Sequence, residues 1–140
     1  KLTSIGPITT TGTLTSTSSM FSNCTLLPAI PAFNTSNVTA AGSMFSGCAA
    51  LAEVPALDLA KATSLANAFA GCTSLTSILA TGIKVTFSIA KCSLGAAALN
   101  TLFTNLGTVT GGQIITITGN PGAATCDKSI AASKGWTVSG

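Results

Sequence analysis

Charge and the residues of common active sites are scarce in this 140-residue sequence. Charged side chains make up 6% of it, against about 25% in an average globular chain, and arginine, histidine and tyrosine are absent. Without histidine there is no Ser-His-Asp or Cys-His constellation and no histidine-containing zinc site. The six lysines are scattered and give a net charge of +3, whereas nucleic-acid binding requires a clustered basic footprint. The composition therefore disfavours these enzyme classes and nucleic-acid partners.

Long apolar runs are also missing, since none approaches the roughly 18 residues needed to span a bilayer. No signal peptide is visible, and the sequence starts at Lys1 rather than Met, so we expect it to be part of a longer chain. Apolar residues still make up 46% and aromatic residues 5%, so the core must consist largely of aliphatic side chains. The surface must then be rich in Thr, Ser, Gly, Asn and Ala, which favours an extracellular, cell-surface or virion location.

A 24-residue repeat dominates the sequence between residues 19 and 90. One coil of this length cannot bury its own apolar face, so roughly three or more must stack, and such a period is typical of solenoids. We therefore predict an α/β solenoid, in which short strands form a narrow parallel sheet. The positions in register are Phe21, Phe45 and Phe69; Cys24, Cys48 and Cys72; Leu27, Leu51 and Leu75; Ile30, Val54 and Ile78; and Ala32, Ala56 and Ala80.

Each repeat is predicted to contain one helical turn and one extended segment. In the second copy the turn covers residues 43–48, with Phe45 and Cys48 on one face, and the extended segment runs from Val54 to Leu57. Residues 1–18 are a degenerate copy. A solenoid that begins without a polar cap exposes the open end of its core, so we expect more chain or another subunit there.

A different unit begins after residue 92, because Cys92 follows Cys72 by less than one full repeat. We predict a helix that Ser93 caps and Gly107 ends. A strand at 115–118, a second short helix at 127–134 capped by Asp127, and a last strand at 136–138 follow. The whole chain, 1–140, then forms one domain. Short coils that follow the repeat occupy 1–92 and larger helix–strand coils occupy 93–140, where Trp136 closes the core.

The cysteines and acids give no pattern for catalysis or metal binding. Cys24, Cys48 and Cys72 share one phase of the repeat, and there is no CxxC pair, so we assign the thiols to core packing. A disulfide between stacked coils remains an alternative, and the redox state of these residues, of Cys92 and of Cys126 is open. Cys126 lies outside the column and is expected to be the exposed thiol. We predict no metal, no cofactor and no catalytic residue.

The three acids, Glu53, Asp58 and Asp127, do not form the paired carboxylates of a hydrolytic site. Three Asn-x-Ser/Thr triplets begin at Asn23, Asn34 and Asn37, and each is a glycosylation acceptor if the source is a secretory eukaryote. Asn23 precedes a core cysteine, so Asn34 and Asn37 are the candidate modification sites.

Three segments carry a resemblance to a known class: 44–48 (MFSGC), 71–78 (GCTSLTSI) and 34–39 (NTSNVT). They resemble the BspA-like leucine-rich repeats of bacterial and protist surface proteins, over residues 19–92. Segments 87–89, 99–103, 119–122 and 134–138 resemble the closing part of leucine-rich modules in phage tail-fibre-like and bacterial surface proteins. The resemblance implies a curved, non-enzymatic leucine-rich-repeat solenoid used for adhesion or receptor recognition.

Two functions fit this interpretation. The first is an extracellular or virion-surface binding module whose partner is a cell-surface glycan or protein receptor, because a solenoid presents a broad face that can vary without disturbing the core. The alternative is a structural subunit of a filament, fibre or virion decoration, whose partners are copies of itself. Neither function requires membrane insertion or an enzymatic activity. The sequence leaves the receptor, the oligomeric state and the binding face open.

Overall fold

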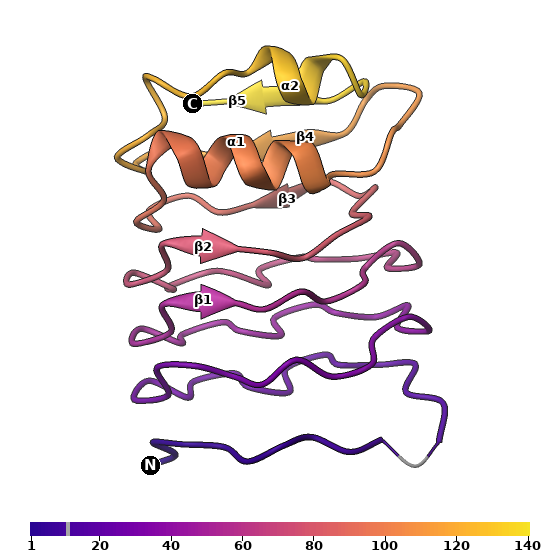
Figure 1. Ribbon diagram of the computed structural model, residues 1–140, viewed down its shortest axis with the longest axis vertical. Coiled ribbons are helices and arrows are strands. Elements are labelled where there is room, and N and C mark those ends of the chain that lie inside the picture. Colours follow the sequence, from indigo (N-terminus) through magenta and orange to yellow (C-terminus); the bar gives the residue numbers. More distant parts are fainter. Residues whose placement is uncertain (11) are drawn as a thin grey trace.

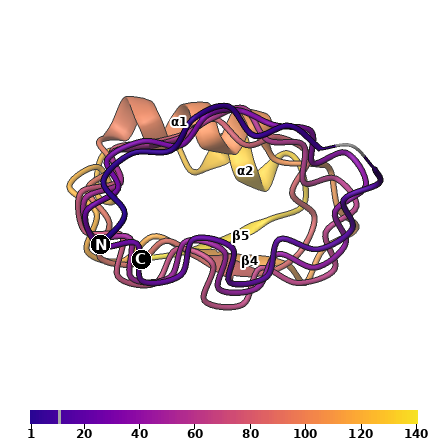
Figure 2. The same ribbon diagram turned by 90° about the horizontal axis from the view of Figure 1, so that it is seen from below.

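The chain winds into coils that lie one above another along the long axis of the molecule (Figure 1). The computed structural model describes residues 1–10 and 12–140. Viewed along the stack, the coils superpose as a flattened ring with the core inside it (Figure 2). The elements in chain order are β1 Glu53–Val54, β2 Ser77–Ile78, β3 Phe87–Ser88, α1 Ala96–Asn105, β4 Ile114–Thr116, α2 Ser129–Ala132 and β5 Thr137–Ser139.

The ring has two long walls, which carry different elements. On the helix wall β1 pairs with β2 in parallel, and α1 contacts β2 and α2. On the opposite wall, here called the ladder wall, β3, β4 and β5 form a parallel three-stranded sheet. Isolated parallel bridges from Ser16 to Ala40 and from Ala40 to Ser64 precede this sheet along the chain. Figure 2 shows α1 and α2 on one side of the ring and β4 and β5 on the other.

The sequence repeat sets the register of the stacked coils. Residues one repeat apart are bridged between coils, as in the pairs Ala29–Glu53 and Val54–Ile78. Of the extended segment predicted from Val54 to Leu57, only Val54 lies in β1, although the carbonyl of Leu57 also accepts from the Thr81 N–H at 2.9 Å. The name leucine-rich-repeat solenoid goes beyond these bridges and stays a prediction.

The helical turn predicted at residues 43–48 is wrong, because its N–H groups alternate between two kinds of partner. Ser46 and Cys48 donate to carbonyls three residues earlier, whereas Ser43, Phe45 and Gly47 donate to the next coil at 2.7–2.9 Å. Ser43 and Gly47 also have φ of 54° and 77°, which no right-handed helix allows. The segment is a series of turns. The expected burial is nevertheless present, since Phe45 and Cys48 are each 1% exposed.

Aromatic rings form a column through the core from one coil to the next. Phe21 stacks on Phe45 with ring centroids 5.7 Å apart, and Phe45 stacks on Phe69 at 5.9 Å. Phe87 continues the column, and Trp136 meets Phe87 edge-on at 5.9 Å. Trp136 is buried at the C-terminal end, as the sequence predicts.

The first predicted helix exists, but its start is wrong. It begins at Ala96 after Gly95, which has no side-chain capping bond. Ser93 does not cap it, because the Ser93 hydroxyl donates to the carbonyl of Thr73 at 2.7 Å in the preceding coil. Inward residues of this helix are buried as the spacing predicts, and they are Leu99, Leu102 and Phe103.

The second predicted helix is shorter than expected and consists of the four residues of α2. Asp127 accepts the N–H of Ser129 at 3.0 Å, but it lies one residue before the N-cap, Lys128. The last strand is β5, and Ile115 and Ile117 of the strand predicted at 115–118 are both fully buried.

The aromatic column supports a stability prediction. Phe45→Ala removes the ring that contacts two neighbouring coils and should lower the free energy of unfolding by about 3–5 kcal/mol. Urea titration followed by the fluorescence of Trp136, the single tryptophan, measures it. The control Ile114→Ala, at a side chain 39% exposed, should cost under about 1 kcal/mol. Equal losses for the two variants would contradict a column that holds the coils together.

Candidate functional site

The acids lie apart in the fold and make no catalytic pair. Glu53 is exposed on β1, and Asp58 is exposed and accepts the N–H of Ala60 at 3.0 Å. Asp127 lies before α2, where it accepts the bond from Ser129 described above. Within residues 1–10 and 12–140, no group of three His, Cys, Asp or Glu side chains is arranged to hold a metal ion.

The cysteines follow the repeat and are free thiols. The Cys48 thiol donates to the carbonyl of Phe21 at 3.0 Å, and the Cys72 thiol donates to the carbonyl of Phe45 at 3.1 Å. Each thiol therefore bonds to the coil before it, which fits the packing role. Cys126 is half-buried, as is Cys24, so the prediction of one distinctly exposed thiol at Cys126 is wrong.

Burial suppresses ionisation of the inner thiols. Desolvation raises the pKa of Cys72 to about 12 and that of Cys92 to about 11, and it also raises the pKa of Cys48. Thiolates are the reactive form of cysteine, so these three groups are poor nucleophiles.

The raised pKa values predict a loss of stability in alkali. In the unfolded chain the thiols ionise from about pH 9, whereas in the folded chain the Cys72 thiol stays protonated up to its pKa of about 12. The stabilisation of the folded state that is present below pH 9 is therefore lost as the pH rises through this range. The free energy of unfolding, measured by urea titration, should be lower at pH 10.5 than at pH 8. The decrease between the two pH values should be smaller in Cys72→Ala than in the wild type. An undiminished drop in Cys72→Ala would contradict this origin.

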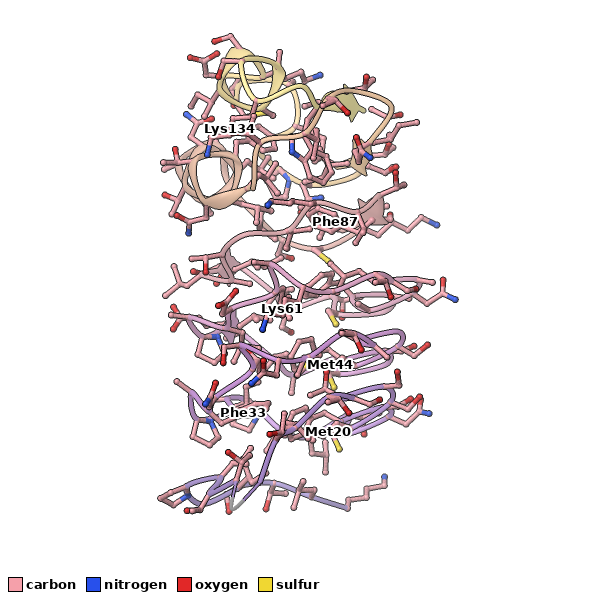
Figure 3. All side chains as sticks on the ribbon, turned by 90° about the vertical axis from the view of Figure 1, so that its right-hand side faces the viewer. Met20, Phe33, Met44, Lys61, Phe87 and Lys134 are labelled. Carbon is pink, nitrogen blue, oxygen red and sulfur yellow. The ribbon has the colours of Figure 1, made fainter. Side chains whose placement is uncertain are left out.

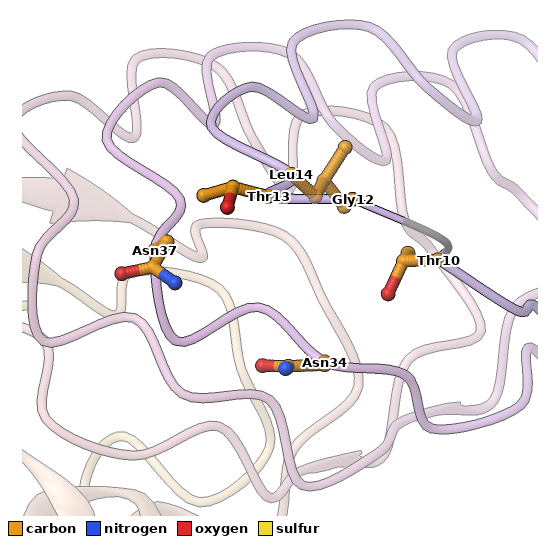
Figure 4. A pocket seen from close by; sticks show the side chains of 6 residues that line it. All are labelled: Thr10, Gly12, Thr13, Leu14, Asn34 and Asn37. Carbon is orange, nitrogen blue, oxygen red and sulfur yellow. The ribbon is translucent and has the colours of Figure 1, made fainter.

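The candidate glycosylation residues lie beside a small hollow near the N-terminal end of the stack (Figure 4). Both asparagines are exposed and line a cavity of about 110 Å³, together with Thr10, Gly12, Thr13 and Leu14. The Asn34 side chain accepts the N–H and the hydroxyl of Ser36, and Asn37 accepts from the Lys61 ammonium at 2.6 Å. Glycosylation of Asn34 or Asn37 remains a prediction.

A larger opening interrupts the ladder wall between the coil that contains Cys72 and the next one. In the preceding coil, the N–H groups of Ala41, Ser43, Phe45 and Gly47 all donate upward, to the carbonyls of residues 64, 66, 68 and 70. Their counterparts one repeat later donate to no backbone carbonyl in the described part of the chain; these are Leu65, Asn67, Phe69 and Gly71. The regular bonding resumes one coil higher, where Ile89 and Lys91 donate to Thr116 and Thr118.

A cavity of about 310 Å³ lies at this interruption, and we call it the ladder slot. Its lining comes from both coils: Asn67, Ala70, Gly71, Thr73, Ser88, Ala90 and Lys91. The lower lip offers the N–H groups of Asn67 and Gly71. The upper lip offers the carbonyls of Ser88 and Ala90, which accept no hydrogen bond from the described residues. The slot thus has donors on one side and acceptors on the other.

The shortened spacing after Cys72 explains the ladder slot. Because less than a full repeat separates Cys72 from Cys92, the chain leaves the wall early, and the carbonyl of Leu94 accepts from Gly122 rather than from Gly71. The side-chain packing also changes here. The rings of Phe69 and Phe87 are inclined by 58°, against 3° and 25° for the two ring pairs before them, and the thiol of Cys92 lies 3.9 Å from the carbonyl of Phe69.

Sequence reasoning missed the ladder slot and the role of Asn120. The change in cysteine spacing was the available signal for the slot, but spacing alone does not show which hydrogen bonds are lost. The sequence places Asn120 in a cluster of turn residues, yet it is only 6% exposed and joins separate coils. Its side chain accepts from the Leu94 N–H at 3.0 Å and donates to the carbonyls of Ile89 and Ile117 at 2.8 Å.

Hydrogen exchange tests the interruption. Amides of Leu65, Asn67, Phe69 and Gly71 should exchange at least about tenfold faster than those of Ala41, Ser43, Phe45 and Gly47, because only the latter set donates to the next coil. The two sets occupy the same phase of adjacent coils and serve as matched controls. Equal protection, measured amide by amide by NMR, would show that the ladder is closed in solution.

The fold and its surface define a repeat protein built from stacked parallel coils. Residues 8–90 match the family described as "Mycoplasma protein of unknown function, DUF285", and the chain belongs to this family. No curated protein and no solved structure matches the chain. Among the helices of the described residues, none has the length and hydrophobicity to cross a membrane.

Proposed function

We propose that this chain is a non-enzymatic binding module of the BspA-like leucine-rich-repeat type, acting in adhesion or receptor recognition at a cell or virion surface. The observation that carries the proposal is the outer face of the ladder wall. A set of positions on this face carries small side chains, and bonds between coils hold the backbone beneath them except at the ladder slot. They are Ser16, Ser18, Ala40, Gly42, Ser64, Ala66, Ser88, Ala90, Thr116, Thr118 and Ser139.

This face is separate from the residues that stabilise the fold. The core consists of inward side chains and the aromatic column, so the outward positions are free to serve recognition. Serine and threonine hydroxyls both donate and accept hydrogen bonds, and the face has no charged side chain among its members, so polar neutral partners such as glycans suit it better than ions. A location outside the cell, as in phage tail-fibre-like adhesins, is part of the same proposal.

The end of the stack favours one alternative, a structural subunit that associates with copies of itself. Met20 is 40% exposed, whereas Met44 at the same phase of the next coil is fully buried; Figure 3 shows the two one coil apart. In the described residues the carbonyls of Ser16, Ser18 and Met20 accept no bond, although those of their counterparts one repeat later do. The opposite end is covered by Trp136 and α2, which leaves it less suited to end-to-end stacking.

Binding by the ladder wall is testable with the purified chain labelled at its N-terminus. We expect saturable binding to a glycan array or to intact cells, and Ser64→Glu should weaken it about tenfold, because a buried unpaired carboxylate opposes contact with a neutral partner. The control Ala56→Glu places the same charge after β1 on the helix wall and should leave binding unchanged.

Two results would contradict the proposal. Absence of binding to every array and cell type would remove the recognition function. Light scattering that shows large ordered assemblies of the 13.7 kDa chain, with no ligand bound, would favour the structural subunit.

A further inference from the structure

We propose that the ladder slot is a carbohydrate subsite that holds a single neutral pyranose ring between the two coils. This inference names a ligand for the binding function proposed above. It rests on that proposed function for the biological role of the slot, but not for the structural argument. It assigns a ligand class and a place on the ladder wall, and it is argued from the unpaired backbone groups.

The two lips decide the chemistry of the ligand. Asn67 and Gly71 offer N–H donors from the lower coil, while Ser88 and Ala90 offer carbonyl acceptors from the upper coil. An anion would satisfy the donors but would face the carbonyl oxygens on the other side. A hydroxyl group both accepts and donates, so a ligand with several hydroxyls can bridge the lips. This pairing favours a sugar over sulfate, phosphate or a carboxylate.

The remaining lining agrees with a sugar ring. The methyl groups of Ala70 and Ala90 give apolar contact for C–H groups, and Thr73 adds a hydroxyl. Lys91 is exposed and lines the same slot, so its ammonium is a further donor for a ring oxygen or hydroxyl.

The size and rigidity of the slot suit one ring. Its volume of about 310 Å³ lies at the lower end of the range of small-molecule sites, about 300–1,000 Å³. The lower lip is held in shape by left-handed residues at both ends, Asn67 with φ of 56° and Gly71 with φ of 76°. The upper lip is held by the bonds from Ile89 and Lys91 to the next coil. A preformed slot avoids the entropic cost of ordering loops on binding.

The chain offers a matched pair of variants for the test. Ala90 lines the slot, whereas Ala56 is exposed after β1 on the helix wall and does not line it. Ala90→Leu fills the slot, and Ala56→Leu adds the same side chain on the opposite wall. Ala70→Leu, on the opposite lip, is a second filling variant if Ala90→Leu fails to fold.

The experiment is an NMR titration of the ¹⁵N-labelled chain with the methyl glycosides of glucose, galactose, mannose and N-acetylglucosamine, and with sulfate as the anionic probe. We expect saturable shifts of the Asn67 and Gly71 amides with at least one sugar, about tenfold weaker binding in the filling variants, and unchanged binding in Ala56→Leu. Circular dichroism and Trp136 fluorescence check folding.

Three outcomes would overturn the proposal: no saturable shift with any sugar, which leaves a slot filled by water; saturation by sulfate alone, which makes it an anion site; or equal binding by Ala90→Leu and wild type. None of them bears on adhesion elsewhere on the wall. Conversely, a slot that binds sugar in a chain that binds no cell would sustain this inference and remove the proposed function.

Discussion

The structure depends on backbone hydrogen bonds that join each coil to the equivalent segment of the next, one sequence repeat further along the chain. These bonds are local in space but distant in sequence, and no coil has enough apolar surface or internal bonding to be stable by itself. The left-handed positions make this possible, because they turn alternate N–H groups out of the segment and toward the neighbouring coil. Ser19 does this in one coil and Ser43 in the next.

The side-chain columns are a consequence of the same register. A residue type that fits between two coils at one phase fits there again one repeat later, so the phenylalanines stack and the thiols reach the preceding carbonyls. Where the interval between cysteines shortens after Cys72, three features change together: the backbone bonds are lost, the rings tilt, and the thiol–carbonyl distance lengthens. Because all three changes occur where the cysteine interval shortens, we infer that the slot results from the junction between the short coils and the larger ones.

The sequence predicts the repeat register and the core well, and the local backbone less well. Columns such as Leu27, Leu51 and Leu75 are fully buried because burial follows the period alone. The prediction of a helical turn at residues 43–48 fails, because spacing of i and i+3 places two side chains on one face in a series of turns as well as in a helix. The prediction that Ser93 caps a helix fails, and the role of Asn120 is missed, for a related reason: their partners lie in other coils, where no local pattern points to them.

The ladder slot shows why the candidate site escapes sequence reasoning. The donors and acceptors on its two sides are main-chain atoms, which every residue has, so residue identity does not reveal them. What distinguishes Gly71 from Gly47 is only whether a carbonyl lies within reach of the N–H, and that depends on the length of chain before Cys92. In a protein with so few charged side chains, the backbone groups released from the ladder add to the Lys91 ammonium as polar groups that the wall can offer a ligand. We therefore propose that, within the ladder wall, the place where the repeat is broken offers a small ligand more hydrogen-bonding groups than the regular coils do.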